Sequence, residues 1–479
     1  MSMLQRAWRW VDERLHIEDD VNEAMYHPIP RGESYADFLG FAAVFVFINQ
    51  FITGILLASS YAPSTALQDG LPYAYWSVKH IMSTPWGHYL RSLHYWGASF
   101  MVVVVFLHML RVFYIGAYKK PREIIWMIGT LLFVTVLAFA FTGYLLPWDQ
   151  EAYWATMVGT AMAGYTPWIG DWITGILRGG LFLSGATVSR FFAIHVLVLP
   201  ITLILLLLLH IGLVFKLGVT EAEKKLPKDY HQRHVKGRRD IPPGMVPFFP
   251  YGVFGMTMTV ALTALILFVV AYFYMPGLTD PADPLNREGY EPKPPWYFMF
   301  LYQFLKFVPG YYWADVFAII VVPALAIAAL FFLPLYDKNP YRSPARRPVG
   351  LATMASVVVV IVGLTYIGMS STVKPPTSTE VKTNATWSDV SAIFANYCAT
   401  CHIASNSGGL SLASYESTMK GGDAGPVIVP GKPEESLLWL VINGKPNKAN
   451  IPPMPLGQQP IPANAIKTIE NWIKNGAPK

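Results

Sequence analysis

Long apolar runs, separated by short polar segments, dominate the first three quarters of the chain. Runs of about 20 apolar residues are long enough to cross a hydrocarbon core as helices. The pattern predicts seven transmembrane helices: Phe38–Tyr61, Leu93–Ile115, Ile124–Leu146, Phe191–Leu217, Val253–Tyr274, Asp315–Leu335 and Val349–Ile367. Ahead of them, Leu4, Trp8, Val11 and Leu15 recur at helical spacing and predict an amphipathic helix on the membrane surface.

The composition agrees with a membrane protein. Of the 479 residues, 53% are hydrophobic and only 14% are charged, whereas soluble domains carry about 25% charged residues. The predicted fold class is an all-α membrane protein in a lipid bilayer. The start of the chain does not have the pattern of a cleavable signal peptide.

Lysine and arginine are concentrated in the N-terminal tail and in the second, fourth and sixth connections between spans. By the positive-inside rule, this distribution predicts a cytoplasmic N-terminus in a cell inner membrane. The basic run Lys224–Arg239 then acts as a topology determinant, and we expect no nucleic-acid partner. Seven crossings that start in the cytoplasm place everything after the last span on the outer, periplasmic side.

Two pairs of histidines lie deep within predicted spans. His94 and His108 are 14 residues apart, and His195 and His210 are 15 residues apart. Both intervals are close to four helical turns, so each pair shares one face of its helix, about 21–22 Å apart along the axis. One buried histidine is usually a core residue, but two matched pairs of ionisable residues at membrane depth indicate function. We predict two stacked bis-histidine sites for two haems.

Glycines and arginines accompany these histidines. Gly40 and Gly54 on the first span, and Gly129 and Gly143 on the third, are each 14 residues apart. This spacing predicts clearance for a flat macrocycle at two levels, although small residues also serve ordinary helix packing in membranes. Three arginines near the histidines are candidate partners for haem propionates, although arginine at a membrane interface also occurs through snorkelling: Arg91, Arg111 and Arg190.

The last quarter of the chain differs in character. A Ser/Thr/Pro-rich stretch at 369–386 predicts a linker. The soluble segment 387–479 beyond it holds both cysteines of the protein, in the sequence Cys398-Ala399-Thr400-Cys401-His402. Cys-x-x-Cys-His is the attachment signature of a covalent c-type haem with an axial histidine. A zinc site would need further Cys or His ligands, and neither type occurs after His402.

The sixth ligand of this haem iron should be a methionine or a histidine. Only Met419 and Met454 follow His402 as candidates. Met454 lies in a proline-stiffened loop, NIPPMPLG, at a distance in sequence that allows it to reach the other haem face. We predict Met454 as the ligand and Met419 as a core residue, with a five-coordinate haem as the remaining possibility.

The stretches RSLHYWGASFMVVVVFLHMLRVFYIGAYKKPREIIWMIGT, FTGYLLPWDQEAYWA and SRFFAIH resemble the cytochrome b of quinol–cytochrome c and plastoquinol–plastocyanin reductases (cytochrome bc and bf complexes). DPADPL, PPWYF and NPYRSPARRPV resemble subunit IV of the bf branch. The last segment resembles a class I monohaem cytochrome c fused behind them. The resemblance implies these parts: an amphipathic segment 1–37, a four-helix dihaem bundle 38–217, a basic cytoplasmic loop 218–252, a three-helix domain 253–368, the linker 369–386 and a periplasmic cytochrome c domain 387–479.

The resemblance implies a quinol:cytochrome c oxidoreductase that works by a Q cycle. A quinol oxidised near the outer surface gives one electron to a separate Rieske iron–sulfur protein, which passes it on to a soluble or membrane cytochrome c. The other electron crosses the membrane to a quinone through an outer haem b at His94 and His195 and an inner one at His108 and His210. The complexes of this family are homodimers. Residues implied at the quinol site are Tyr144, Pro147, Trp148, Pro294, Pro295, Trp296 and Tyr297.

Two positions depart from the family pattern. The family motif usually reads Pro-Glu-Trp-Tyr, and its carboxylate is thought to accept a quinol proton, but Pro295 stands here in its place. Glu291 and Glu151 are nearby in sequence and are candidate substitutes. In the bf branch a cysteine at the position of Phe38 anchors an extra haem, which phenylalanine cannot do. We therefore expect two haem b and one haem c per chain.

Two other function classes remain open at this stage. A membrane haem conduit or quinol dehydrogenase without Rieske-coupled bifurcation would accord with the missing carboxylate at Pro295. A structural or assembly subunit with degenerate sites is the other class. The four paired histidines and the Cys-x-x-Cys-His sequence argue against it.

Overall fold

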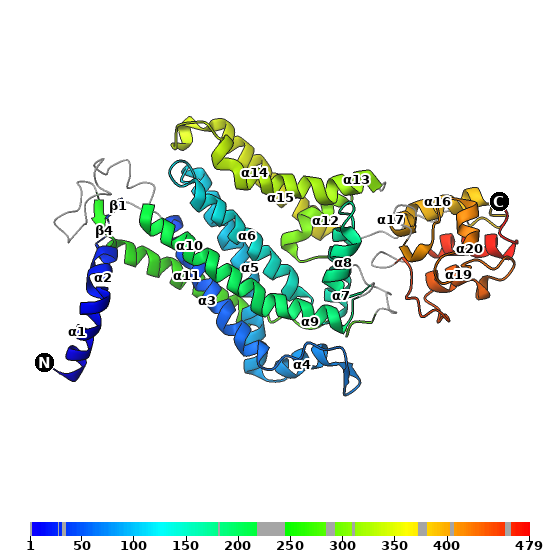
Figure 1. The fold of residues 1–479 in the computed structure, drawn as a ribbon, viewed down its shortest axis with the longest axis horizontal. Coiled ribbons are helices and arrows are strands. Elements are labelled where there is room, and N and C mark those ends of the chain that lie inside the picture. Colours follow the sequence, from blue (N-terminus) through cyan, green and yellow to red (C-terminus); the bar gives the residue numbers. More distant parts are fainter. Residues whose placement is uncertain are drawn as a thin grey trace.

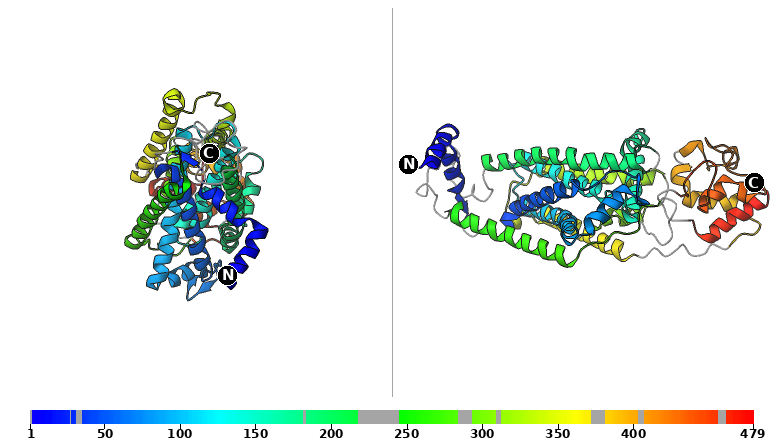
Figure 2. Two further views of the ribbon diagram at one scale, coloured as in Figure 1. Left: turned by 90° about the vertical axis from the view of Figure 1, so that its left-hand side faces the viewer. Right: turned by 90° about the horizontal axis from the view of Figure 1, so that it is seen from below.

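The computed structural model of the chain describes residues 2–26, 28–30, 35–180, 183–217, 245–283, 293–308, 312–371, 381–402, 407–455 and 461–479. Its long helices run between two ends of an elongated molecule (Figure 1). Helices α1 (Met3–Leu15) and α2 (Ile17–Met25) lie at one end, and the C-terminal domain lies at the other, as the side view in Figure 2 also shows.

Among the described residues, seven helical segments are long and apolar enough to cross a membrane, which confirms the predicted all-α membrane fold with seven spans. In chain order they are η1 (Tyr35–Phe38) with α3 (Leu39–Ala58), α5 (Pro85–Tyr114), α6 (Glu123–Tyr144), α9 (Gly185–Ala193) with η2 (Ile194–Val198) and α10 (Leu199–Leu217), η6 (Phe248–Gly252) with α11 (Val253–Phe273), α13 (Tyr312–Val316) with η8 (Phe317–Val321) and α14 (Val322–Tyr336), and α15 (Pro348–Ser370).

Some spans extend beyond their apolar runs because capping residues decide where they begin. Helix α5 starts at Pro85, eight residues before the predicted start at Leu93. Thr84 accepts a hydrogen bond from the backbone N–H of Gly87 at 3.1 Å, and proline suits the first helical position because its missing N–H would have no partner there. Local chemistry at Thr84 therefore outweighs the polar character of the first two turns.

The remaining elements are short. Between the spans lie β2 (Leu67–Gln68), β3 (Leu71–Pro72), α4 (Tyr73–Met82), α7 (Gln150–Gly164), α8 (Gly170–Arg178), η7 (Trp296–Phe298), α12 (Met299–Leu305) and η9 (Pro344–Arg346). Strand β1 (Pro28–Pro30) pairs antiparallel with β4 (Met245–Pro247), and β2 pairs antiparallel with β3. The C-terminal domain contains α16 (Trp387–Tyr397), α17 (Ala399–His402), η10 (Ser407–Gly409), α18 (Tyr415–Lys420), η11 (Pro433–Glu435), α19 (Leu437–Ile442) and α20 (Ala463–Lys474).

Helices α3, α5, α6 and α10 form a four-helix bundle around one apolar layer. Each contributes at least one buried residue to this layer: Val46 from α3, Met101 and Val102 from α5, Val136 from α6, and Leu203 from α10. Along α5, Met101 and Val102 lie midway between His94 and His108. The layer therefore separates two levels at which the bundle carries histidines.

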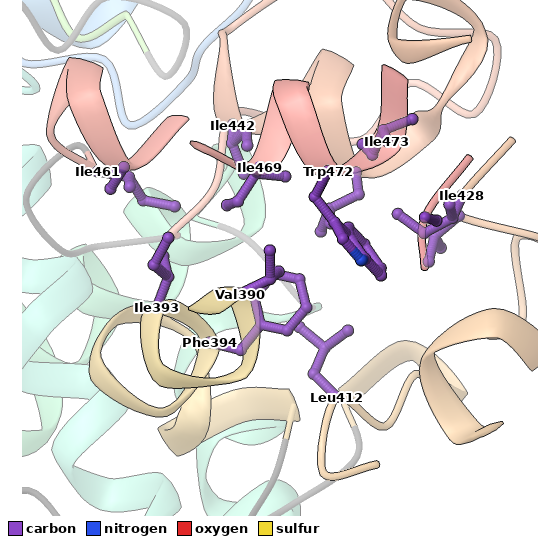
Figure 3. Packing of buried hydrophobic residues seen from close by; sticks show 14 of the residues in the cluster. Val390, Ile393, Phe394, Leu412, Ile428, Ile442, Ile461, Ile469, Trp472 and Ile473 are labelled. Atoms are coloured by element: carbon purple, nitrogen blue, oxygen red, sulfur yellow. The ribbon is translucent and has the colours of Figure 1, made fainter. Parts of the chain in front are cut away.

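The C-terminal domain has its own hydrophobic core, built mainly from its first and last helices. Val390 and Phe394 on α16 face Ile469, Trp472 and Ile473 on α20, as Figure 3 shows. Phe394 and Trp472 pack edge to face with ring centroids 6.4 Å apart. The helical patterns predicted at both ends of this segment therefore correspond to helices that pack on each other.

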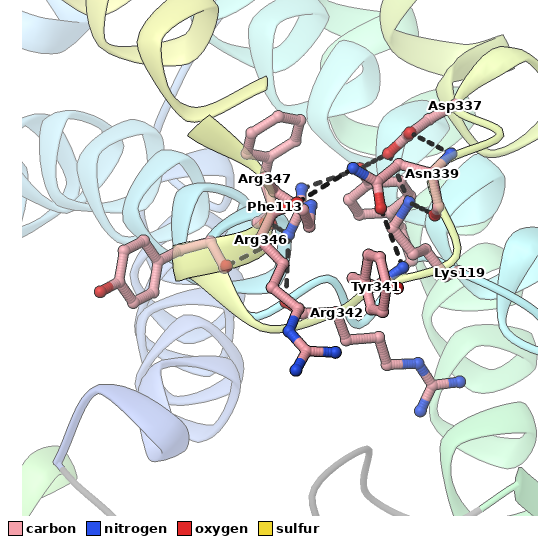
Figure 4. Close-up of polar contacts among 10 residues, drawn as sticks. Phe113, Lys119, Asp337, Asn339, Tyr341, Arg342, Arg346 and Arg347 are labelled. Carbon is pink, nitrogen blue, oxygen red and sulfur yellow. Dashed lines mark hydrogen bonds and ion pairs between the residues drawn. The ribbon is translucent and has the colours of Figure 1, made fainter. Parts of the chain in front are cut away.

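A polar network joins the two halves of the membrane domain, from the α5–α6 connection to the segment after α14 (Figure 4). Lys119, from the α5–α6 connection, contacts Asp337 after α14 at 2.6 Å between Nζ and Oδ2, and Tyr118 also donates to Asp337. The guanidinium of Arg347, which is 3% exposed, donates to the Tyr118 hydroxyl at 2.9 Å and to the Phe113 carbonyl at 2.9 Å. Segments more than 200 residues apart in sequence are thereby held together.

Replacing Asp337 by asparagine should destabilise the membrane domain, because Lys119 would keep its charge in a largely buried position. Breaking such a pair costs on the order of 3 kcal/mol. Burial alone would raise the pKa of Asp337, but hydrogen bonds from Lys119 and Tyr118 outweigh it and lower this pKa. The stabilisation of the folded membrane domain by the ionised Asp337 carboxylate is therefore fully present above about pH 4, and it is lost as the pH falls through the lowered pKa of Asp337.

The measurement is the thermal midpoint at which the detergent-solubilised protein loses its b-haem absorbance. Asp171→Asn makes the same change of charge at an exposed site on α8 and should leave the midpoint unchanged. Equal midpoints for Asp337→Asn and the unmodified protein at pH 7 would refute the role of this network.

Candidate functional site

Two of the four predicted histidine ligands face each other at the level of the bundle near α7 and α8. The ring centroids of His94 on α5 and His195 on η2 are 6.3 Å apart, with 72° between the ring planes. An imidazole nitrogen lies about 2 Å from a bound transition-metal ion and about 1.2 Å from its own ring centre, so two rings on opposite sides of one ion would lie about 6.4 Å apart. The spacing fits one metal ion between the rings.

Threonine hydroxyls define the state of both rings. Thr53 Oγ1 lies 2.9 Å from Nδ1 of His94, and Thr142 Oγ1 lies 3.0 Å from Nδ1 of His195. Each hydroxyl donates its own hydrogen to a carbonyl of its helix, at 2.6 Å to Asn49 and 2.9 Å to Ala138. The hydroxyl oxygen must then accept from Nδ1–H. This tautomer leaves Nε2 with a free lone pair, which is the form that binds a metal.

These two threonines were not predicted from the sequence. Thr53 directly precedes Gly54 and Thr142 directly precedes Gly143, so the same Thr-Gly dipeptide occurs on α3 and α6. This repeat, at the two positions opposite the histidines, is the signal that could have found them.

His108 and His210 form the second level, near β1 and β4. Within the described part of the chain, neither Nδ1 atom has a hydrogen-bond partner. The two levels therefore differ: hydroxyls orient the rings at the first level, whereas none does so at the second.

The four predicted glycines lie directly against the four histidine rings. A Cβ atom would lie 3.2 Å from Cε1 of the ring at Gly54 and 2.6 Å at Gly143, where the neighbours are His94 and His195. At Gly40 and Gly129, which face His108 and His210, the same distance is 3.4 Å. The imidazole rings therefore lie directly against the four glycines, and the predicted clearance for a macrocycle stays a prediction.

A proline explains the unusual helix at His195. Pro200 lies five residues further on and has no N–H to donate to a helical carbonyl. The chain accommodates it with the π-helical turn η2, in which the N–H of Leu199 bonds to the carbonyl of Ile194. Such turns are rare and are often found at functional sites.

The three candidate arginines each contact protein groups. Arg91 donates to the carbonyls of Pro276 and Gly277, which lie in the extended segment after α11. Arg111 forms an ion pair with Asp37. Arg190 donates to the carbonyls of Gly175 and Ile176 in α8. All three lie near a histidine level, and their contact with haem propionates stays a prediction.

The predicted quinol-site residues gather at the end of the bundle near α7. Tyr144 is the last residue of α6, and the turn that follows it places Trp148 in the left-handed backbone region, at φ 52°. Trp296 of η7 donates from Nε1 to Oγ of Ser99 on α5 at 3.2 Å. Tyr297 packs against the bundle layer.

The other residues of this set are placed as follows. Pro294 and Pro295 lead into η7, where the carbonyl of Pro295 accepts from the N–H of Phe298 at 2.9 Å. Pro147 lies in the turn between α6 and α7. Glu291 lies outside the described residues, so only Glu151 of the two candidate carboxylates can be placed.

In the C-terminal domain, Cys398 directly precedes α17, and Cys401 and His402 lie within it. Nδ1 of His402 lies 3.4 Å from the carbonyl of Leu410. A ring that donates Nδ1–H to this carbonyl presents Nε2 for metal binding. The residues therefore suit the covalently attached haem that their sequence predicts.

Both candidate methionine ligands pack against the core of this domain. The N–H of Met454 bonds to the carbonyl of Val441 at 2.9 Å, which fixes the backbone of its loop. Met419 lies on α18. The choice of Met454 over Met419 stays a prediction.

Comparison with known proteins places these sites in a family. Residues 27–218 match the family model "Cytochrome b/b6/petB", and residues 281–387 match "Cytochrome b(C-terminal)/b6/petD". Cytochrome b of Allochromatium vinosum is 33% identical over 374 residues, which cover 75% of this chain and 87% of that protein. The chain belongs to the cytochrome b family. Residues 398–455 match the model "Planctomycete cytochrome C", so a cytochrome c domain is fused behind the cytochrome b.

Further relatives agree with this family. The cytochrome b subunit of the menaquinol:cytochrome c reductase of Bacillus subtilis is 39% identical over 227 residues, covering 46% of this chain and 99% of that subunit. Cytochrome b/c1 of Bradyrhizobium diazoefficiens is 31% identical, covering 76% of this chain and 50% of that protein. A solved hyperthermophilic respiratory Complex III aligns with a TM-score of 0.65 and 28% identity, covering 77% of this chain and 92% of that one.

Family membership settles the general role. This cytochrome b is a multi-pass membrane protein that binds haem and belongs to electron transport. Its general activity is therefore that of an oxidoreductase.

The glycine contacts give a testable difference between the two levels. Gly143→Ala should push the His195 ring aside, because a Cβ would lie 2.6 Å from Cε1 and 3.2 Å from Nε2. Gly129→Ala should be tolerated, because its Cβ would lie 3.4 Å from the nearest ring atom. Overpacking of the first kind costs about 1–3 kcal/mol. We expect loss of b haem per chain in Gly143→Ala only; full haem content with an unchanged spectrum there would contradict the geometry.

Proposed function

We propose that this cytochrome b is the quinol-oxidising subunit of a complex that works by a Q cycle. The four histidines at two levels of one bundle carry this proposal. His94 and His195 would hold an outer haem b, and His108 and His210 an inner one. When bound, the two haems supply a one-electron path across the membrane from a quinol on the outer side to a quinone on the inner side.

The residues around the two histidine levels are suited to holding two haems. Thr53 and Thr142 orient the outer ligands through Nδ1, and the four glycines leave room for the rings. The apolar layer at Met101 and Val102 keeps water out between the levels. Arg91 and Arg190 at the outer level and Arg111 at the inner level supply the positive charge that propionates require.

The fused domain extends the path on the outer side. Cys398 and Cys401 would form the thioethers of one haem c, with His402 and Met454 as iron ligands. We infer that this domain passes electrons to a soluble or membrane cytochrome c. In support, Figure 1 places it at the end of the molecule opposite α1 and α2, and the positive-inside rule assigns the latter to the cytoplasm.

A separate Rieske iron–sulfur protein completes the complex in this proposal. The chain has two cysteines, and both belong to the Cys-x-x-Cys-His sequence, so a cluster bound by cysteines needs another subunit. By family resemblance we expect the complex to be a homodimer in the cell inner membrane.

One observation favours a second function. Pro295 has no acid–base group at the position where the family motif carries a carboxylate. A quinol dehydrogenase without Rieske-coupled bifurcation, or a haem conduit, would not need that group. The two functions differ in partner. If the protein works by a Q cycle, a Rieske protein should co-purify with a tagged form of this chain. Inhibitors of the outer quinol site should then stop cytochrome c reduction. A complex without an iron–sulfur signal, insensitive to those inhibitors, would favour the second.

The haem content tests the cofactor assignment. A pyridine haemochrome assay should give c and b haems in a ratio of 1:2, because one Cys-x-x-Cys-His and two histidine levels are present. Phe38 is buried, and its ring lies where a side chain on Gly255 would otherwise fit. A third b-type haem per chain would contradict this assignment.

A further inference from the structure

The turn between α6 and α7 brings a carboxylate back over the end of α6. Trp148 reverses the chain in the left-handed region, and α7 starts two residues later at Gln150. As a result, the carboxylate of Glu151 accepts a hydrogen bond from the hydroxyl of Tyr144, seven residues earlier. Glu151 keeps an exposed side, so an incoming molecule can reach it.

The side chains of Asp149 and Gln150, next to Glu151, form hydrogen bonds to backbone groups that stabilise this turn, whereas the carboxylate of Glu151 forms none of these bonds. Asp149 caps α7: its Oδ1 accepts from the N–H of Ala152 at 2.9 Å and its Oδ2 from the N–H of Thr279 at 3.3 Å. The amide of Gln150 bonds to the backbone of Asp283. The carboxylate of Glu151 is thus available for other chemistry.

Tyrosines from α5, α6 and η7 form a cluster, and the carboxylate lies at two of its members. Tyr95, one residue from His94 on α5, lies close enough to Glu151 for the carboxylate to act electrostatically on its hydroxyl. Tyr297 of η7, two residues from Pro295, interacts in the same way with Tyr144 and Tyr95. Glu151 therefore lies in the cluster where η7 meets the outer histidine level.

Two fixed charges act on this cluster. Asp149 lies beside Glu151 on α7, and Arg91 acts on Tyr95 from α5 while donating to carbonyls of the segment after α11. Burial first, and repulsion by Asp149 second, raise the pKa of Glu151, whereas the hydrogen bond from Tyr144 lowers it in part. A carboxyl with a raised pKa is a better general base near neutral pH.

We propose that Glu151 accepts a proton from the quinol at the outer site, in the role that the carboxylate missing at Pro295 would have. The proposal rests on the quinol oxidation proposed above. Oxidation of a quinol to a quinone releases two protons and two electrons. One O–H bond breaks as its proton moves to a carboxylate oxygen of Glu151, giving a neutral carboxylic acid. The two electrons go to the two one-electron acceptors of the proposed complex, one an iron–sulfur protein and the other the haem-binding histidine level, and the second proton is released to water.

The experiment measures reduction of a soluble cytochrome c by a short-chain quinol, as a function of pH, in the purified complex. Glu151→Gln should lower the rate by about 10²-fold and remove the decline of the rate toward acid pH. Glu151→Asp should restore part of the rate. Asp171→Asn, an exposed acid on α8, is the matched control and should behave as the unmodified complex.

Two further variants test the role through its pH dependence. The base must be deprotonated to act, so the rate declines as the pH falls below the pKa of Glu151. Tyr144→Phe removes a hydrogen bond that lowers this pKa, so the decline should move to higher pH. Asp149→Asn keeps a good helix cap but removes the repulsion that raises the pKa, so the decline should move to lower pH.

The outcomes distinguish failure of the proposed function from failure of the proposed role of Glu151. An unmodified complex that does not oxidise quinol would overturn the proposed function itself. An active complex in which Glu151→Gln keeps both its rate and its acid decline would overturn only the role of Glu151. Displacements of the decline in the same direction in Tyr144→Phe and Asp149→Asn would also overturn it, even if Glu151→Gln fails to assemble.

Discussion

The structure depends on two imidazole rings that face each other across a helical bundle with space for one metal ion between them. The residues packed around His94 and His195 hold the rings at this separation. Thr53 and Thr142 hold Nδ1 of each ring from one side, and glycine backbones at their next residues leave room for the ring edges. The distance between the helices, the Nδ1–H tautomer of both imidazoles and the glycines beside them all follow from the need to place two metal-binding rings face to face.

The outer site follows from the same constraint. Because α6 supplies both the threonine and the glycine beside His195, its C-terminal end lies next to the outer histidine level. The end of α6 at Tyr144, the turn at Trp148 and the start of α7 at Glu151 therefore lie where η7 arrives from the second half of the chain. The histidine level of His94 and His195 and the carboxylate proposed as proton acceptor are neighbours because α6 contributes to both.

The seven spans, the histidine levels and the fused haem c sequence could be predicted from the chain alone, since each has a strong periodic or local signal. The contact between Tyr144 and Glu151 could not be predicted, because it depends on the chain reversal at Trp148. Trp148 has a positive φ, which is uncommon for a residue other than glycine and has no signal in the sequence. The true start of α5 was missed because the cap at Thr84 lies outside the apolar run. The sequence also could not show which glycine lies against which histidine ring. That pairing depends on the register between neighbouring helices, which hydrophobic periodicity does not determine.

The most direct test of the account is a redox titration of the b-haem absorbance in His195→Asn and His210→Asn, compared with the unmodified complex. Two components of different midpoint potential are expected in the unmodified protein. Each variant should lose one of them and retain the other, because each histidine belongs to a separate level. Loss of the same component in both variants, or retention of both components in either, would contradict the two-level arrangement.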